Sequence, residues 1–464
     1  MPKLYIFLKR KSQRILGFFP LYHRFSWFYL KVKNFRKHYR FVLKSQWFDQ
    51  EKIRQYQRTH LKHILTYAYE NVPYYKQLFD THTISVDEIQ SKEDLIKIPI
   101  TNKELVKAHP DDFLSKEYKK FAPCVNKTSG STGKPLEIFI DEELNSLVSA
   151  LLWRHYNWAG CVFHSRRVEI TYPLGFYKGV VDTQNLYEFD VTKKMLTINS
   201  ALLNEKTLPT LCETIESFKP SHIFAYPSLM SLFAKYLARN PKFKIRPKSI
   251  ILQAEKVYPE QRTFLEHIFG CPSFDFYGHW EFVVFAHECE YHNLHLNSEL
   301  GITEIIKNGK VCAEREIGEL VVTTLHNHSM PLIRYATGDY GYIREESCQC
   351  GRKMPVIEIV GSREKDLIVT KKGFFNVVSA LPFLFDPQGN IKQIQFYQES
   401  KDHLIVRIVK GEGFLDSNIE RMKNILSGYF LDSIGISFEF LEAIPRTKAG
   451  KYKYVDSKVP IEFS

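Results

Sequence analysis

One short run of residues has the side chains and spacing to hold a phosphate: Thr128, Ser129, Gly130, Ser131, Thr132, Gly133, Lys134 and Pro135. Small hydroxyl residues and glycines let successive backbone N–H groups turn toward one anion, and the hydroxyls and the lysine add further donors. The run is not a Walker loop, because that pattern needs glycine at position 128 and serine or threonine at position 135. Its composition therefore predicts a phosphate-binding loop rather than a plain turn.

Two short groups of cysteine and histidine could bind a metal ion. Cys289, His292 and His295 lie within seven residues of one another, and Cys348 and Cys350 follow about fifty residues later. Thiolates and imidazole delivered as two short clusters suit tetrahedral Zn²⁺. The Cys-x-Cys spacing is tighter than the usual pair, and either histidine could complete the set.

Several other segments accompany the phosphate loop in one order along the chain. They cover residues 50–75, 225–228, 254–255, 277–281, 334–339, 361–366 and 445–451. In this order they resemble the adenylate-forming enzymes, and specifically the phenylacetate–CoA ligase-like branch found in capsule-biosynthesis clusters (CapK-like). The resemblance extends from about residue 45 to the end of the chain.

This resemblance implies an ATP site. Besides the loop, the residues expected to line it are Ala254, Glu255, Tyr277, Gly278, Asp339 and Arg363. In the family the matching tyrosine stacks near adenine, the aspartate binds both ribose hydroxyls and the arginine faces the ribose. Glu281 would help to hold Mg²⁺ and is one of two expected catalytic residues.

The resemblance also implies an acyl pocket and a moving lid. The pocket would include Tyr226, Pro227, Ser228 and His279, and Asp366 would be the hinge pivot. The C-terminal loop offers Lys448, Lys451 and Lys453. Lys451 is expected to be the second catalytic residue, because it alone follows a glycine as the family pattern requires.

Several members of this branch carry a structural zinc on a cysteine–histidine pair and a Cys-x-Cys. The matching residues here are Cys289, His295, Cys348 and Cys350, with His292 as the alternative ligand. Four protein ligands leave no open position on a tetrahedral ion, so the implied role is structural.

The implied reaction joins a small carboxylic acid to a thiol with the use of ATP. An acyl adenylate and pyrophosphate form first, and the acyl group then passes to a thiol, which is expected to be that of CoA. A carrier protein, or an amine or hydroxyl of a sugar, is the alternative acceptor, and the capsule-cluster resemblance suggests capsule or surface polysaccharide biosynthesis. A non-catalytic nucleotide sensor or scaffold is a different class, disfavoured because Asp339 and the lysine loop are present.

The elements that must position these residues can be read from periodicity. A helix is predicted after the basic N-terminal segment, because one face at 3.6-residue spacing would carry Ile53, Tyr56, His60, Leu61, Ile64, Leu65 and Ala68. Helical segments alternate with short β-rich runs up to about residue 360, which favours a layered α/β domain. After residue 390, two strands, a helix and a strand indicate a small α+β unit. We therefore expect a basic N-terminal segment at 1–48, a large ATP- and acyl-binding domain at 49–362 and a small mobile lid domain at 363–464.

The whole excess of positive charge lies at the N-terminus. Residues 1–48 contain twelve Lys or Arg, fourteen aromatic residues and no acid, and subtracting the twelve from 64 leaves 52 basic against 52 acidic residues in the remainder. Such a segment suits an anionic membrane surface, whereas the plainer alternative is a basic helical pair whose aromatic residues pack on the body. Nucleic acid is not expected, because no base-reading module is present and residues 49–464 are neutral.

The predicted compartment is the cytoplasm. No apolar run reaches the roughly 18 residues that a membrane-spanning helix needs. A signal peptide is not predicted either, because Lys9-Arg10-Lys11 directly follows the apolar stretch Leu4–Leu8. Eight scattered cysteines suit reduced thiols rather than a disulfide framework. Peripheral contact with the inner membrane face through residues 1–48 stays an open alternative.

Overall fold

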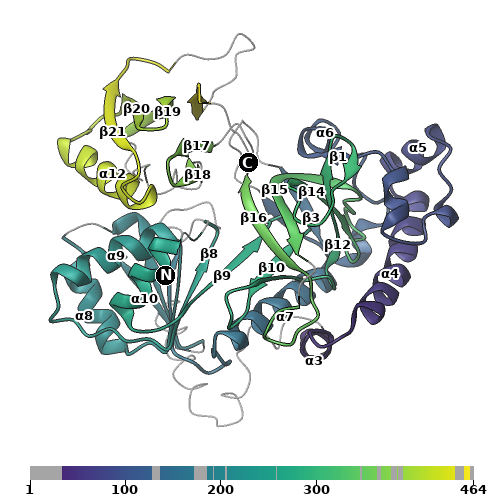
Figure 1. Ribbon diagram of the computed structural model, residues 1–464, viewed down its shortest axis with the longest axis horizontal. Coiled ribbons are helices and arrows are strands. Elements are labelled where there is room, and N and C mark those ends of the chain that lie inside the picture. Colours follow the sequence, from purple (N-terminus) through teal and green to yellow (C-terminus); the bar gives the residue numbers. More distant parts are fainter. Residues whose placement is uncertain are drawn as a thin grey trace, which may run out of the picture. The chain divides into compact units, whose positions relative to one another are not determined.

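The computed structural model in Figure 1 describes most of the chain. The described residues are 34–127, 136–171, 185–191, 193–203, 206–255, 257, 259–344, 347–362, 367–377, 384, 390–444 and 454–459. They form two compact units, the first from Ala159–Asp275 and Ile368–Pro460 and the second from Val32–Trp158 and Phe276–Leu367. The phosphate loop at 128–135, Arg363, Asp366, Lys451 and residues 1–33 lie outside the described residues.

The first unit contains a mainly parallel sheet. Its strands follow the order β8 (Ser249–Gln253), β7 (His222–Ala225), β4 (Arg167–Thr171), β6 (Met195–Asn199) and β5 (Tyr187–Asp190). Every pair is parallel except β6 with β5. β7 is buried along its whole length, as expected for a parallel strand covered by helices. The helices are α8 (Leu208–Phe218), α9 (Pro227–Arg239) and α10 (Pro259–Phe269).

The same unit ends in a small α+β layer. Its strands follow the order β21 (Gly435–Phe440), β20 (His403–Lys410), β19 (Ile391–Ser400) and β22 (Val455–Ser457), beside a two-stranded pair of β17 (Leu367–Thr370) and β18 (Gly373–Asn376). α12 (Asp416–Tyr429) packs Met422 and Leu426 into a core with Phe396 and Val406. The two strands, helix and strand expected after residue 390 are therefore present.

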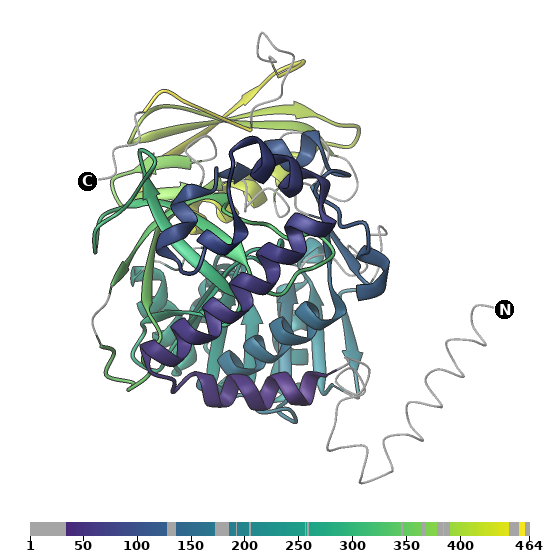
Figure 2. The same cartoon turned by 90° about the vertical axis from the view of Figure 1, so that its right-hand side faces the viewer.

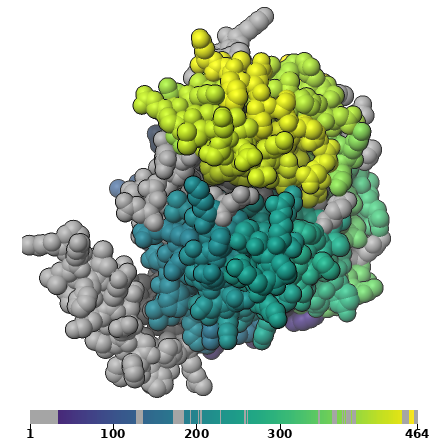
Figure 3. All heavy atoms as spheres, turned by 90° about the vertical axis from the view of Figure 1, so that its left-hand side faces the viewer, coloured from purple at the N-terminus to yellow at the C-terminus, as the bar shows by residue number. Residues whose placement is uncertain are grey.

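Within the first unit, α12 also packs beside α9. Ile425 of α12 lies against the core of the parallel-sheet layer. Nζ of Lys235, on α9, lies 3.6 Å from a carboxylate oxygen of Asp432. Figure 3 shows the two layers in contact, with the yellow-green C-terminal atoms directly above the teal atoms of the helical layer.

The second unit is built around a mainly antiparallel sheet. Its strands follow the order β13 (Lys310–Val311), β12 (Gly301–Lys307), β14 (Gly318–Thr324), β15 (Tyr335–Arg344), β16 (Val356–Ser362), β11 (Leu294–Leu296) and β10 (Phe285–Glu288). The last residues of β9 (Ser273–Gly278) pair with β10, and β1 (Thr101–Asn102) runs parallel to β15. A separate ribbon joins β2 (Cys124–Lys127) and β3 (Glu137–Ile140).

Helices flank this sheet, as Figure 2 shows for the purple and blue segments. They are α3 (Phe35–Ser45), α4 (Gln50–Asn71), α5 (Pro73–Thr81), α6 (Lys103–Ala108) and α7 (Glu142–Trp158). The predicted apolar stripe of α4 is buried at Leu61, Ile64, Leu65 and Ala68. α3, from the basic N-terminal segment, packs against α7 in this unit.

Short 3₁₀ helices cover Val86–Glu88, Glu93–Lys97, Tyr118–Phe121 and Ser200–Leu202. Among the helices of the described residues, none combines the length and the apolar character needed to cross a membrane.

Candidate active site

Asp339 lies in the middle of β15 with its side chain mostly buried. Its backbone N–H donates to Oγ1 of Thr337 at 3.1 Å, and the N–H of Gly338 donates to a carboxylate oxygen of Glu319 at 3.2 Å. The hydroxyl of Thr337 in turn donates to the carbonyl of Leu320 on β14 at 2.9 Å. These bonds fix the backbone from which the Asp339 carboxylate projects.

Tyr277 and His279 meet this carboxylate although they precede it by 62 and 60 residues. The phenol of Tyr277 donates to Oδ2 of Asp339 at 2.8 Å. Nε2 of His279 lies 2.8 Å from the same oxygen and 2.7 Å from the phenol oxygen. The structure therefore brings the segments 277–281 and 334–339 into direct contact.

Glu281 adds a second carboxylate to this group. Its Oε2 lies 3.7 Å from Nδ1 of His279, so the imidazole has a carboxylate near each of its nitrogens. Oε1 of Glu281 lies 3.6 Å from Nζ of Lys103, the first residue of α6, and both side chains are buried. We call Tyr277, His279, Glu281, Asp339 and Lys103 the polar cluster.

The members of the polar cluster shift one another's pKa values. Burial alone would lower the pKa of His279, but the carboxylates of Asp339 and Glu281 raise it to about 9. Burial alone would raise the pKa of Glu281, but His279 and then Lys103 lower it to about 2. Burial and the charge of Asp339 raise the pKa of Tyr277 well above its usual value. At neutral pH the cluster thus holds an imidazolium, an ionised Glu281 and a neutral phenol.

Gly278 is required by a close approach within this part of the sheet. A Cβ placed on it would lie 2.3 Å from two ring carbons of Phe285, its partner across β9 and β10. That distance is far shorter than any contact between carbon atoms. The absence of a side chain at Gly278 therefore lets the ring of Phe285 pack over the end of β9.

Apart from Tyr277, Gly278 and His279, the described residues expected near adenine and the acyl group lie in the first unit. Ala254 and Glu255 directly follow β8, while Tyr226 and Pro227 directly follow β7 and begin α9. β7 and β8 are adjacent and parallel, and the carboxyl ends of such strands are where α/β sheets bind ligands. Tyr226 and Glu255 are buried, and the side chain of Ser228 lies outside the described residues.

Three cysteines and a histidine converge in the second unit. The ligand atoms of Cys289, His295, Cys348 and Cys350 all lie within 4.8 Å of one another. The sulfurs of Cys289 and Cys348 are 3.7 Å apart, and the sulfur of Cys350 lies 3.3 Å from Nε2 of His295. Around one tetrahedral zinc, two sulfurs would be roughly 3.8 Å apart, and a sulfur and an imidazole nitrogen roughly 3.6 Å. These four residues, the thiol–imidazole cluster, have the dimensions of a closed zinc site.

The orientation of His295 agrees with a ligand role. Its Nδ1 lies 3.0 Å from the carbonyl oxygen of Met354, which can only accept a hydrogen bond, so Nδ1 carries the proton and Nε2 is left to face the sulfurs. Burial lowers the pKa of His295 to about 4, which keeps the ring neutral. His292, the alternative ligand, instead lies 3.1 Å from a carboxylate oxygen of Glu288.

Backbone N–H groups point at two of the sulfurs. The N–H of Tyr291 donates to the sulfur of Cys289 at 3.4 Å, and that of Cys350 donates to the sulfur of Cys348 at 3.5 Å. The side-chain amide of Asn293 also donates to Cys348, at 3.3 Å. Donors of this kind favour thiolates over thiols, which is the form that binds a metal.

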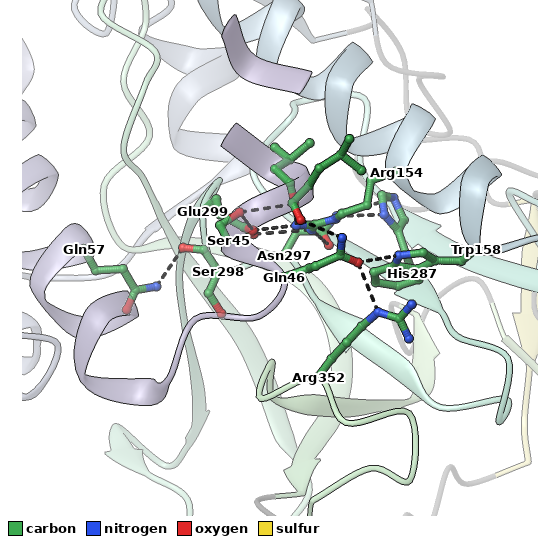
Figure 4. A network of polar contacts seen from close by, with 12 residues as sticks. Ser45, Gln46, Gln57, Arg154, Trp158, His287, Asn297, Ser298, Glu299 and Arg352 are labelled. Carbon is green, nitrogen blue, oxygen red and sulfur yellow. Dashed lines mark hydrogen bonds and ion pairs between the residues drawn. The ribbon is translucent and has the colours of Figure 1, made fainter. Parts of the chain in front are cut away.

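A buried polar network ties the helices of the second unit to its sheet (Figure 4). Arg154 donates to Oε1 of Glu299 at 2.6 Å and to Asn297 at 2.8 Å. Ser45 on α3 also donates to Glu299, at 2.5 Å, and Asn297 lies 3.0 Å from Nδ1 of His287. One buried guanidinium thus links α3, α7 and the residues that follow β11.

Arg352 connects this network to the thiol–imidazole cluster. Its guanidinium lies 4.2 Å above the ring of Trp158, whose ring is in turn 6.1 Å from that of His295. Trp158 and Arg352 both donate to Oε1 of Gln46, at 2.9 and 3.2 Å (Figure 4). Since Arg352 follows Cys350 by two residues, these contacts hold the Cys-x-Cys segment in place.

A cavity of about 780 Å³ opens elsewhere in the second unit. Its lining includes Arg54, Arg58, Leu61, Lys92, Ile302 and Arg352. None of the polar cluster is among its lining residues, so we do not assign it to the acyl pocket.

Lys103 is the member of the polar cluster that the sequence did not indicate. It lies outside every segment that resembles the family, and nothing in its neighbours marks it as functional. Only the parallel pairing of β1 with β15, Thr101 with Tyr335 and Asn102 with Ala336, carries it to Glu281.

Comparisons with known proteins agree with these findings. The family model of the CapK C-terminal domain matches residues 363–458. A phenylacetate–coenzyme A ligase of Thermus thermophilus is 25% identical over 341 residues, which cover 69% of this chain and 72% of that protein. Protein CapK of Staphylococcus aureus is 22% identical over 412 residues, which cover 87% and 89%.

Solved structures of a 2-hydroxyisobutyryl-CoA ligase share the fold. The complex with 2-HIB-AMP in the postadenylation state has a TM-score of 0.58 at 18% identity and covers 86% of this chain and 88% of that one. The complex with 2-HIB-AMP and CoA in the thioesterification state has a TM-score of 0.57 at 17% identity and covers 89% and 91%.

The fold is that of the adenylate-forming enzymes, so the predicted α/β class with a small α+β C-terminal part is confirmed. The resemblance to the phenylacetate–CoA ligase-like, CapK-like branch is also confirmed, by the matched C-terminal domain and by both relatives. The chain is thus related to AMP-forming acid–thiol ligases, and the predicted enzyme class is confirmed at that level.

Proposed function

We propose that this protein activates a small carboxylic acid with ATP and transfers the acyl group to the thiol of CoA, in the synthesis of capsule or surface polysaccharide. The hydrogen bond from Tyr277 to Asp339 carries the proposal, because it joins two segments that resemble nucleotide-binding elements of the family. The relatives support the thiol acceptor, and the resemblance to CapK supports the biological setting.

The first step exchanges one bond to phosphorus for another. An oxygen of the substrate carboxylate attacks the α-phosphorus of ATP, and the bond to pyrophosphate breaks. Negative charge grows on the α-phosphate and the leaving pyrophosphate, so positioned donors lower the barrier. The proposed donors are Lys451 and the backbone and side chains of residues 128–134. In the second step the thiolate attacks the acyl carbon, and the bond from that carbon to AMP breaks.

Asp339 would accept hydrogen bonds from the ribose hydroxyls. Tyr277 and His279 already contact its Oδ2, so the carboxylate is oriented before the nucleotide binds. Tyr277 would also lie near the adenine together with Ala254 and Glu255, and Arg363 would face the ribose. The acyl pocket would include Tyr226, Pro227, Ser228 and His279.

Glu281 fits a Mg²⁺ ligand. Proteins commonly hold Mg²⁺ through one or two carboxylates together with substrate phosphates. A buried carboxylate whose pKa is about 2 supplies such an oxygen at neutral pH. The ion, when bound, would offset the charge of the phosphates, and Lys103 would balance Glu281 in its absence.

We assign a structural Zn²⁺ to Cys289, His295, Cys348 and Cys350. The distances within the thiol–imidazole cluster and the contact of His295 with Met354 support this assignment. A fully ligated ion there would fix the turn after β10 to the Cys-x-Cys segment.

The small C-terminal domain at 363–464 would act as a lid on the large domain at 49–362. Asp366 would be the hinge pivot, and closure would bring Lys451 to the reacting phosphate before the lid turns to admit the thiol. The match of the CapK C-terminal domain to residues 363–458 supports this domain boundary.

Exchange of pyrophosphate with ATP, across a panel of aryl, fatty, hydroxy and amino acids, tests the proposal. Exchange with one class of acid, abolished by Lys451→Ala and retained by the neighbouring Lys448→Ala, is the expected result. Loss in Lys448→Ala with activity in Lys451→Ala would overturn the choice of lysine. A protein that binds ATP but exchanges with no acid of the panel would point to the nucleotide sensor instead.

A further inference from the structure

The basic residues of α3 are displayed on its outer surface. Arg36, Lys37, Arg40 and Lys44 are all exposed, and the helix contains no acidic residue. Positions 36, 40 and 44 recur every four residues, so their side chains lie along one face of the helix. α3 thus carries a continuous cationic stripe, and its place at the edge of the unit can be seen in Figure 2.

The opposite face of α3 is anchored, so the stripe cannot turn inward. The carbonyl of Val42 accepts from the buried Arg154 at 3.0 Å, and Ser45 donates to Glu299 at 2.5 Å. Nε2 of His38 lies 2.7 Å from a carboxylate oxygen of Glu143. Glu143 also accepts a hydrogen bond from the side-chain amide of Asn34, at 2.7 Å, which ties this carboxylate to the start of α3.

An exposed tryptophan extends the stripe. Trp47 follows Lys44 by three residues and is 55% exposed. The guanidinium of Arg352 lies 5.2 Å above its ring, which holds the indole against the protein on that side. Tryptophan beside cations is the composition found where proteins meet the headgroup region of a membrane.

We infer that α3 and Trp47 form a docking surface for an anionic lipid bilayer. The charge argues for this occupant, because residues 49–464 are neutral while 1–33 add eight more cations and no acid. A bilayer is favoured over nucleic acid because the surface pairs its cations with a large exposed ring at the end of a helix. The inference goes beyond the proposed function, since none of these residues belongs to the polar cluster.

Flotation of the full-length protein with vesicles tests the inference. The probe is a mixture of phosphatidylglycerol and phosphatidylcholine, compared with phosphatidylcholine alone and with a short DNA duplex. Binding to the anionic vesicles, weakened by salt raised from about 0.05 to about 0.5 M, is expected. Each basic residue at such a surface contributes roughly fivefold in affinity, so Arg40→Gln with Lys44→Gln should weaken binding roughly 25-fold.

The matched control removes two exposed lysines of the first unit, Lys371→Gln with Lys392→Gln. This control should leave vesicle binding close to that of the natural protein. A separate variant, Trp47→Ala, should reduce the part of the vesicle binding that remains at high salt. Equal losses of vesicle binding in the Arg40/Lys44 variant and in the Lys371/Lys392 control, no flotation, or binding of the duplex in place of vesicles would each overturn the inference. Pyrophosphate exchange should be unchanged in every variant, and thermal unfolding should be unchanged in the two double variants, which separates this test from that of the proposed function.

Discussion

The phenol of Tyr277 donates a hydrogen bond to Oδ2 of Asp339 across 2.8 Å, although 62 residues separate the two in the chain. His279 contacts the same oxygen, so one carboxylate organises an aromatic ring and an imidazolium. A carboxylate held in this way has little freedom to lose when a ligand binds it, which favours tight and specific recognition.

Asp339→Asn should weaken ATP binding far more than it weakens the fold. Asparagine has the same shape but no charge, so the bonds expected from the ribose lose their charge assistance. A charged hydrogen bond contributes about 1.5–3 kcal/mol, so KM for ATP in pyrophosphate exchange should increase roughly 10- to 100-fold. Asp402→Asn, at an exposed position, is the control. Equal KM values in the two variants would contradict the ribose assignment.

Removal of one ligand should release the proposed zinc. Cys350→Ser should purify without the stoichiometric zinc expected of the natural protein, as measured by metal analysis, and should unfold at a lower temperature. His292→Ala should retain the metal, because His292 faces Glu288 rather than the sulfurs. Cys312→Ser, outside the cluster, is the thiol control. Zinc retained in Cys350→Ser but lost in His292→Ala would reverse the ligand assignment.

Arg154→Met should destabilise the second unit strongly. The substitution leaves the buried Glu299 without the guanidinium that now lies 2.6 Å from it. Removing one partner of a buried ion pair typically costs about 3–5 kcal/mol of unfolding free energy. Arg407→Met, which breaks a more exposed pair with Glu439, should cost under about 1 kcal/mol. Denaturant unfolding of both variants measures the difference, and similar values would contradict a central role for Arg154.

Mild acid should destabilise the protein through its buried histidines. Burial lowers the pKa of His155 and His326 to about 3 and that of His222 to about 4, from an ordinary value of 6.5. As pH falls below about 6.5 the unfolded chain takes up these protons and the folded chain does not, so the unfolding free energy decreases. The melting temperature should therefore decrease as the pH is lowered from about 7 to about 4.

His155→Phe isolates one of these groups. Without that imidazole, the pH dependence should be shallower by up to about 1.4 kcal/mol per pH unit. A slope that matches the natural protein would mean that His155 does not stay neutral in the folded state.

Patterns local in sequence predicted much of the fold. The stripe of α4 was readable because helix periodicity repeats within a few residues, and β19, β20, α12 and β21 were readable in the same way. The cysteine and histidine pattern likewise indicated a metal ligand set without knowledge of the fold. The choice between His292 and His295 depended on the tertiary structure. His295 lies on β11, which carries it toward Cys350, whereas His292 lies in the turn before that strand.

The sequence by itself thus determined the class of enzyme, the order of its segments and some of its helices and strands, because each depends on residues close together in the chain. Only the tertiary structure decided that Lys103 meets Glu281, that Tyr277 meets Asp339 and that α3 turns its cations outward. Those contacts depend on strand register and on which helix face is buried. Both are set by packing between distant segments, for which no local pattern in the chain is sufficient.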